Sequence, residues 1–274
     1  MNDPDFFLGT DSTVLCGLLL ALMLLASVIG FTVGRLRHSE DDTNGATVQI
    51  ESALFGLLGL LLAFTFAAAA SRNETRKELM VDASNAIGTV YLRTFLYEPQ
   101  TGSTLRVHLK DYLDQRIAYY DVRSDIAAIR QVLAKTDQLQ NQLWGQVMQA
   151  SRQQEHYLAS MQMIPAMNEM FDLASSRLSY DRTHIPDILL IVLTIQALAA
   201  AFANGYNSSK SRHFNFFASI GFALLTVMVV YLILDLDRPR RGILNLDVQQ
   251  QLFTELRSKM DADAKLALPF SKPQ

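Results

Sequence analysis

The sequence contains a single cysteine, Cys16, among 274 residues. One cysteine cannot form an internal disulfide or a cysteine-based zinc site. Catalytic motifs are missing as well, because there is no GxxxxGK[ST] phosphate loop, no GxSxG, no HExxH and no GxGxxG pattern. The five histidines are scattered over different predicted elements. These absences argue against an enzyme, and we expect no catalytic residues, no metal site and no cofactor.

Charged residues are also few, at 19% of the chain, and the formal net charge is only −3. A chain of this charge offers no basic surface for nucleic acid. Half of the residues are hydrophobic and the mean hydropathy is +0.14, a value that soluble domains seldom reach. The composition therefore predicts a lipid bilayer as a partner and no nucleic acid.

Four apolar segments are long enough to cross a bilayer, which takes about 20 residues of α-helix. They cover residues of about 14–33, 50–70, 185–202 and 214–234. No lysine or arginine precedes the first segment, so we expect a retained helix and not a cleaved signal peptide. No charged residue lies in the middle of any span, which argues against a proton pump or a voltage sensor.

The spans divide the chain into four parts. Residues 1–70 form an N-terminal tail and a transmembrane hairpin, and 71–184 form a helical extramembrane domain. Residues 185–235 form a second transmembrane hairpin, and 236–274 a C-terminal tail. No stretch alternates with the period of two that is typical of strands. The predicted fold is an all-α membrane protein, with four transmembrane helices in two hairpins and a large helical block between helices 2 and 3.

Apolar residues in the central block recur at helical spacing. The first of its helices should continue the second membrane helix up to the Pro–Gly break at 98–102. Ser103 or Thr104 is expected to cap the next helix, and further helices are expected over about 125–150 and 151–180. Pro165 lies inside the last helix and should kink or split it.

Small residues recur along the second span at Gly56, Gly59, Ala63 and Ala67. Such spacing lets helix backbones approach closely in lipid. The pattern fits two arrangements. The helix either packs against copies of itself around a pore or packs tightly within one subunit.

A second stripe on the same span holds Phe55, Leu62 and Phe66, with Thr65 beside it. In a ring of subunits, these side chains would form a hydrophobic constriction that gates by dewetting. The same spacing also arises when aromatic residues face lipid, and a threonine hydroxyl often bonds back to its own helix. The four residues are candidates for the pore and its constriction.

Charged residues follow the second span at Arg72 and Arg76, and the fourth span at Asp235, Asp237 and Arg238. They are candidates for a charged mouth that concentrates ions. They also fit a simple membrane stop with snorkelling arginines. The positive residues near the span ends favour a cytoplasmic location for both termini and the central block.

Four runs together resemble the bestrophin-like domain family of bacterial membrane proteins: FGLLGLLLAFTFA at 55–67, NAIGTVYLR at 85–93, LKDYLDQRIAYY at 109–120 and YLILDLDRPRRG at 231–242. Bestrophins are pentameric anion channels with cytoplasmic termini and a pore lined by the second membrane helix. The resemblance thus implies a homo-oligomer, a pentamer by analogy, that passes inorganic ions across a bacterial inner membrane. The chain lacks a clear cluster of acidic residues of the bestrophin calcium-site type, so a calcium gate is not expected.

Two functions remain open from the sequence. The first is an oligomeric, bestrophin-like ion channel with passive ion conduction, of anions by analogy, through a pore lined by the second membrane helix. The second is a non-conducting sensor or scaffold whose helical domain binds a partner or ligand.

Overall fold

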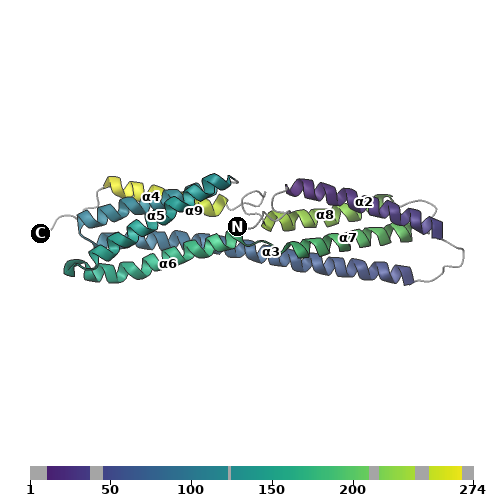
Figure 1. Ribbon diagram of the computed structural model, residues 1–274, viewed down its shortest axis with the longest axis horizontal. Helices are drawn as coiled ribbons and strands as arrows, with labels where there is room; N and C mark the ends of the chain where they lie inside the picture. The colour runs from purple at the N-terminus through teal and green to yellow at the C-terminus, as the bar shows by residue number, and fades with distance from the viewer. Residues whose placement is uncertain (1–10, 38–45, 123–124, 210–215, 238–246, 267–274) are drawn as a thin grey trace. The chain divides into compact units, whose positions relative to one another are not determined.

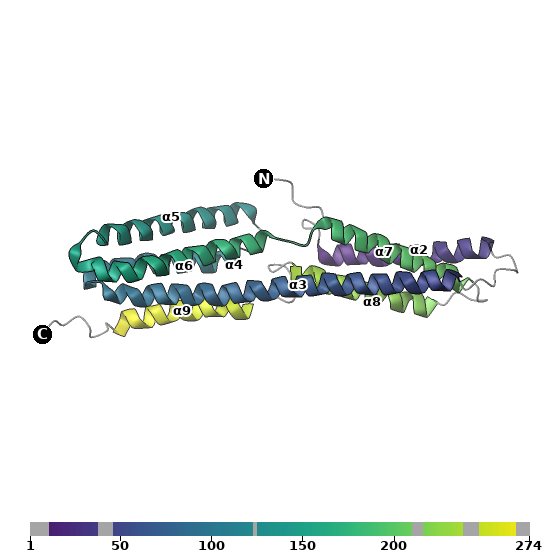
Figure 2. The same cartoon turned by 90° about the horizontal axis from the view of Figure 1, so that it is seen from below.

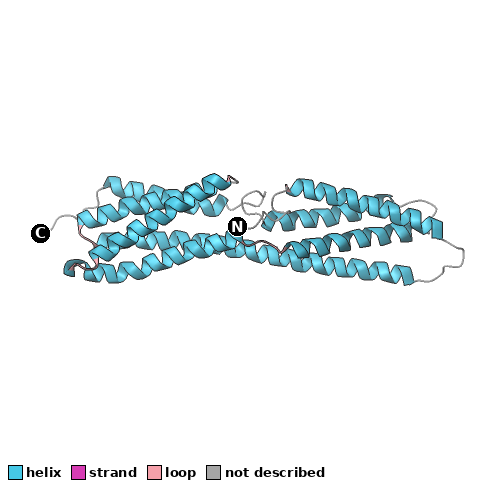
Figure 3. Ribbon diagram, in the orientation of Figure 1, coloured by secondary structure: helices cyan, strands magenta, loops and turns pink. Residues whose placement is uncertain are grey.

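Every regular element of the described chain is a helix (Figures 1 and 3). The computed structural model describes residues 11–37, 46–122, 125–209, 216–237 and 247–266. The α-helices are α2 (Ser12–Arg37), α3 (Ala46–Arg93), α4 (Pro99–Asp121), α5 (Ile126–Ala150), α6 (Tyr157–Arg182), α7 (Asp187–Ser208), α8 (Phe216–Asp237) and α9 (Asp247–Leu266), and two short 3-10 helices are η1 (Thr94–Leu96) and η2 (Gln154–His156). The all-α prediction is confirmed for these residues.

The helices group into two compact units. The membrane unit comprises Met1–Asn73 and His184–Arg238, and the helical unit comprises Glu74–Thr183 and Pro239–Gln274. Helix α3 contributes to both as one unbroken helix of 48 residues. The helix of the second span therefore continues into the central block, as predicted.

The membrane unit contains α2, the first part of α3, α7 and α8. Four helical segments of the described chain are long and apolar enough to cross a bilayer, in agreement with the predicted spans. Large apolar side chains cover the outside, among them Phe64 at 65% exposure, Leu225 at 68% and Phe217 at 89%. Water would not tolerate so much exposed apolar surface, whereas lipid does.

Within this unit, α2 and α7 pack closest, through small residues. A Cβ atom on Gly205 of α7 would lie 1.9 Å from the backbone oxygen of Ser27 of α2. A Cβ atom on Gly30 would lie 2.1 Å from the backbone oxygen of Phe202. The Ser27 hydroxyl also donates a hydrogen bond of 3.0 Å to the Ala201 carbonyl. Glycine therefore permits a backbone approach that no other residue would allow.

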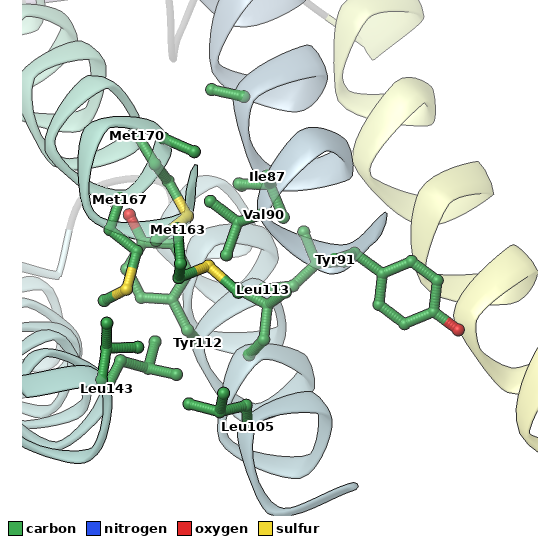
Figure 4. Close-up of a cluster of buried hydrophobic side chains, with 14 of the residues drawn as sticks. Ile87, Val90, Tyr91, Leu105, Tyr112, Leu113, Leu143, Met163, Met167 and Met170 are labelled. Atoms are coloured by element: carbon green, nitrogen blue, oxygen red, sulfur yellow. The ribbon is translucent and has the colours of Figure 1, made fainter. Parts of the chain in front are cut away.

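The helical unit has a core built from α3, α4, α5, α6 and α9. Figure 4 shows Met163, Met167 and Met170 of α6 gathered near Tyr112 and Val90. Flexible methionines fill the irregular spaces between such helices. The buried residues of this core form one cluster. They include Met80, Ile87, Val90, Leu105, Leu109, Tyr112, Leu113, Leu143, Val147, Met163, Met167, Met170, Phe253 and Met260.

Helix α9 is part of this core, although the sequence had indicated only a C-terminal tail. Phe253 is fully buried and Met260 is 1% exposed. Arg257 of α9 forms a two-pronged ion pair with Asp114 of α4, at 2.6 Å from Nε to Oδ1 and 3.2 Å from Nη2 to Oδ2. Figure 2 shows α9 running beside α3, and the Tyr91 hydroxyl donates to Asp263 at 3.3 Å.

Ionic contacts reinforce this docking. Asp261 of α9 pairs with Lys110 and Arg257. The hydrogen bonds from Arg257, and then from Lys110, lower the pKa of Asp261 to about 2. The carboxylate therefore stays ionised, and keeps both pairs, over the whole physiological pH range.

Two predicted helix starts were wrong. Helix α4 begins at Pro99, not after Ser103, because proline is pre-set for the first helical position and lacks the N–H that would need a cap. The Ser103 hydroxyl instead bonds back to the Gln100 carbonyl at 2.8 Å. The fourth helix of the block begins at Tyr157, after the turn η2, and continues through Pro165 to Arg182.

Candidate functional site

No described segment of the chain covers the small-residue face of α3. Gly56, Gly59, Ala63 and Ala67 are all exposed. A Cβ atom on Gly56 or Gly59 would meet nothing within 4 Å beyond the helix itself, as far as the structure describes the chain. Gly205 of α7, by contrast, lies directly against the backbone of α2. Tight packing against the described residues of the same subunit therefore does not account for Gly56 and Gly59.

Both ends of this membrane segment are tied to the rest of the unit. At one end, the Asn207 amide of α7 donates to Glu51 at 2.6 Å and to the Thr47 carbonyl at 3.1 Å. At the other end, Arg72 pairs with Asp237 of α8. Between them, Leu58 and Ala69 face the unit's own core. The helix is thus anchored along one side while its small residues face outward.

The stripe of Phe55, Leu62 and Phe66 lies on α3 between the side that faces the unit's core and the face of small residues. The Phe55 ring contacts the Phe222 ring of α8, with centroids 4.8 Å apart, and Leu62 is partly buried against the same core. Phe66 is 39% exposed. Thr65 is buried and its hydroxyl bonds back to the Leu61 carbonyl at 2.7 Å. Phe66 is consequently the member of the stripe whose side chain is most available to a neighbour or a lumen.

One candidate for the charged mouth, Asp237, contacts residues of two other segments of the chain. Asp237 is buried at the end of α8, and its two oxygens accept from the Ile185 backbone N–H at 3.2 and 3.1 Å. Ile185 precedes the N-terminus of α7, where a helix favours negative charge. Arg72 of α3 lies 3.7 Å from the same carboxylate. Asp237 therefore joins α3, α7 and α8.

The other charged candidates have different surroundings. Asp235 is buried at 3% exposure, and Arg238 lies outside the described residues. Arg76, in the helical unit, is 1% exposed and donates to the Thr183 carbonyl at 2.9 Å and the Tyr180 carbonyl at 3.4 Å. It thereby satisfies backbone acceptors at the C-terminal end of α6.

Two buried arginines in the helical unit were not singled out from the sequence. Arg177 of α6 lies over the Tyr120 ring at 3.9 Å and near the Phe253 ring at 5.4 Å. Arg116 of α4 lies 5.8 Å from the Tyr119 ring. Burial lowers the pKa of Arg177 to about 10. Aromatic rings from α4 and α9 thus face Arg177, a contact between segments far apart in the chain that the sequence alone does not indicate.

The contacts of Asp237 with Ile185 and Arg72 lead to a testable prediction. Asp237→Ala removes both acceptors of the Ile185 N–H and leaves Arg72 without its carboxylate, so we expect a loss of about 2–4 kcal/mol of stability. Asp237→Asn keeps an acceptor and should lose about half as much. Arg72→Ala, which removes a partly exposed pair, should cost no more than about 1 kcal/mol. Unfolding midpoints in detergent measure this order, and equal losses for Arg72→Ala and Asp237→Ala would contradict it.

Comparison with known proteins gives one family. A family model described as the Bestrophin-like domain matches residues 16–250. A variant of a bacterial bestrophin homologue from Klebsiella pneumoniae has a similar crystal structure, with a TM-score of 0.72 at 15% identity, covering 92% of this chain and 99% of that chain. Another crystal structure of that homologue gives 0.69 at 16% identity, covering 89% and 98%.

Sequence identities of this size establish a shared fold and no more. No curated protein sequence matches the chain. The family match, however, extends over most of the 274 residues. The chain therefore belongs to the bestrophin-like domain family.

Proposed function

We propose that the protein is an oligomeric channel that conducts ions passively through a central pore lined by α3. The uncovered face of Gly56, Gly59, Ala63 and Ala67 is the observation that carries this proposal. Family membership and the fold of the Klebsiella homologue support it. In this proposal the membrane is a bacterial inner membrane, and the helical unit and both termini are cytoplasmic.

The uncovered face favours contact with further copies of the chain. In lipid, apolar surface alone does not drive helices together, and small residues act by letting backbones approach. The small residues of α2 and α7 are already used in this way inside the subunit, because Gly30 lies against the α7 backbone at Phe202 and Gly205 against the α2 backbone at Ser27. At Gly56 and Gly59 of α3, by contrast, no described atom beyond the helix lies within 4 Å of a Cβ atom. In a closed ring every subunit makes the same contacts with its two neighbours, so the small-residue face of each α3 would meet a neighbouring subunit, and resemblance to bestrophins favours five subunits.

A ring of this kind would place α3 around the axis. The proposal assigns the constriction to Phe66, whose exposed ring would meet its copies, with Phe55 and Leu62 along the same edge. Rings of apolar side chains close a narrow pore by excluding water. No acidic or basic residue lies between Glu51 and Arg72 of this helix, which favours passive conduction over a proton-coupled cycle.

Ion flux from proteoliposomes tests the proposal. The purified full-length protein should carry current, and reversal potentials across a KCl gradient would give the sign of the permeant ion. The resemblance to bestrophins predicts that the permeant ions are anions. Absence of any flux from a folded, homogeneous oligomer would overturn the channel and favour the non-conducting sensor or scaffold.

The substitution Phe66→Ala tests whether the Phe66 ring forms the constriction of the pore. Removal of the ring should widen and wet the constriction, so we expect conductance to rise several-fold. Phe64→Ala is the matched control, since Phe64 is 65% exposed but points to another side of α3. Planar-bilayer recordings should show little change for Phe64→Ala. Equal responses of the two variants would argue against a constriction at Phe66.

A further inference from the structure

Three side chains with metal-binding chemistry meet at one end of the helical unit. Glu98 is the N-cap residue of α4, and Glu155 and His156 form part of the turn η2 between α5 and α6. One ligand atom from each residue lies within 4.8 Å of the other two. Glu98 is more than fifty positions from the adjacent residues Glu155 and His156, so its proximity to them is a product of the fold and not of local sequence.

His156 provides independent support for a ligand. Its residue exposure is only 3%, and its Nε2 atom is buried without a hydrogen-bond partner in the described structure. That nitrogen lies 3.7 Å from Glu98 Oε1, which places it toward the carboxylates. A buried polar atom without a partner is costly, and native structures usually satisfy it with a protein group, water or an ion.

The position of the imidazole is set by its surroundings. The Tyr97 ring lies 5.5 Å from the His156 ring, and the Tyr97 hydroxyl is 3.1 Å from the Ser160 hydroxyl. The two glutamates, by contrast, are exposed. A fixed imidazole with two adjustable carboxylates requires little rearrangement to bind a cation. Donor atoms bonded to one tetrahedral ion at about 2.1 Å lie about 3.4 Å apart, so the carboxylates need only move inward.

We propose that Glu98, Glu155 and His156 bind a divalent transition-metal ion, with Zn²⁺ as the best-fitting choice. An imidazole nitrogen with two carboxylate oxygens suits zinc and its neighbours better than Mg²⁺ or Ca²⁺, which prefer all-oxygen ligands. Three protein ligands leave a fourth position for water. The ion would fasten the start of α4 to the α5–α6 connection. This site is separate from the proposed pore and does not depend on ion conduction.

The sequence had predicted no metal site, because its histidines are dispersed. It also placed His156 within a regular helix. The 3-10 turn η2 instead buries His156 while Glu155 stays exposed beside it. This local departure from α-helix is what brings the ligands together.

Zinc titration of the full-length protein tests the proposal. The protein would be purified in detergent without a polyhistidine tag and stripped with a chelator. We expect one Zn²⁺ per chain by calorimetry, a higher thermal unfolding midpoint with zinc, and ligand-field absorption bands with Co²⁺. His156→Gln should weaken binding by more than the roughly 10–100-fold that loss of an outer-shell group causes. Glu98→Gln and Glu155→Gln, at exposed positions, should also weaken it without preventing folding.

His108→Gln is the matched control, because His108 already contacts the Gln146 amide at 2.7 Å through Nδ1. It should bind zinc like the parent protein. Lack of zinc binding by the folded parent would overturn the site, leaving only the 3.7 Å contact between Glu98 and His156. Unchanged binding in both glutamate variants would overturn it as well, even if His156→Gln fails to fold.

Discussion

Substitution of Gly205 by leucine is expected to abolish the folded membrane unit. Even a Cβ atom at this position would lie 1.9 Å from the Ser27 carbonyl oxygen and 2.7 Å from its carbon. Those are backbone atoms of α2, so they cannot rotate away. The two helices must separate, which breaks the Ser27–Ala201 hydrogen bond and the packing around it. We expect the loss to exceed the roughly 1–3 kcal/mol that is typical of overpacking. Size-exclusion profiles and protease resistance in detergent measure the outcome.

Gly59→Leu is the matched control for this experiment, because it places the same side chain on a glycine in another membrane helix. No atom outside α3 lies within 4 Å of a Cβ atom there, as far as the chain is described. The subunit should fold normally, with a small gain in helix propensity of up to about 1 kcal/mol. Under the proposed function, the larger side chain should instead weaken assembly. A folded Gly205→Leu protein, or an unfolded Gly59→Leu protein, would contradict the packing described for α2, α3 and α7.

Phe253→Ala is expected to release α9 from the helical unit. The ring is fully buried, belongs to the core and faces the Arg177 guanidinium. Truncation of a buried phenylalanine typically costs about 3–5 kcal/mol. Here it also removes one of the aromatic faces that stabilise a buried cation. Hydrogen exchange of α9 amides should accelerate strongly, and the unfolding midpoint of the helical unit should fall.

Leu158→Ala gives the comparison, since Leu158 is 79% exposed in α6. Its effect on stability should stay within about 0.5 kcal/mol. If Phe253→Ala left the exchange rate of α9 unchanged, α9 would be held by its ion pairs with Asp114 and Lys110 and not by its apolar face.

The membrane spans were predictable because each is a long apolar run with no mid-span charge, a pattern that few other structures share. The unbroken α3 was predictable for a related reason, since helical periodicity continues past Arg72. The close contact between α2 and α7 was not predicted. Gly30 and Gly34 of α2 are nevertheless four residues apart, which is the same small-residue spacing that was noted in α3.

Other features depend on contacts that a single sequence does not reveal. Arg76 was predicted as a charged-mouth candidate, and its hydrogen bonds to carbonyls 104 and 107 positions away at the end of α6 required the fold. The docking of α9 depends on a short amphipathic stripe of Phe253, Leu256 and Met260, which indicates a helix without identifying its partner. Asp237 was predicted as a charged-mouth or membrane-stop residue, and its acceptor role toward Ile185 required the fold.

The symmetry of full-length particles in lipid nanodiscs tests the proposed channel most directly. Single-particle images should show a closed ring of identical subunits, with α3 nearest the axis and the faces of Gly56, Gly59, Ala63 and Ala67 at subunit contacts. A monomer with α3 facing lipid, or a ring with α2, α7 or α8 at its centre, would contradict the account.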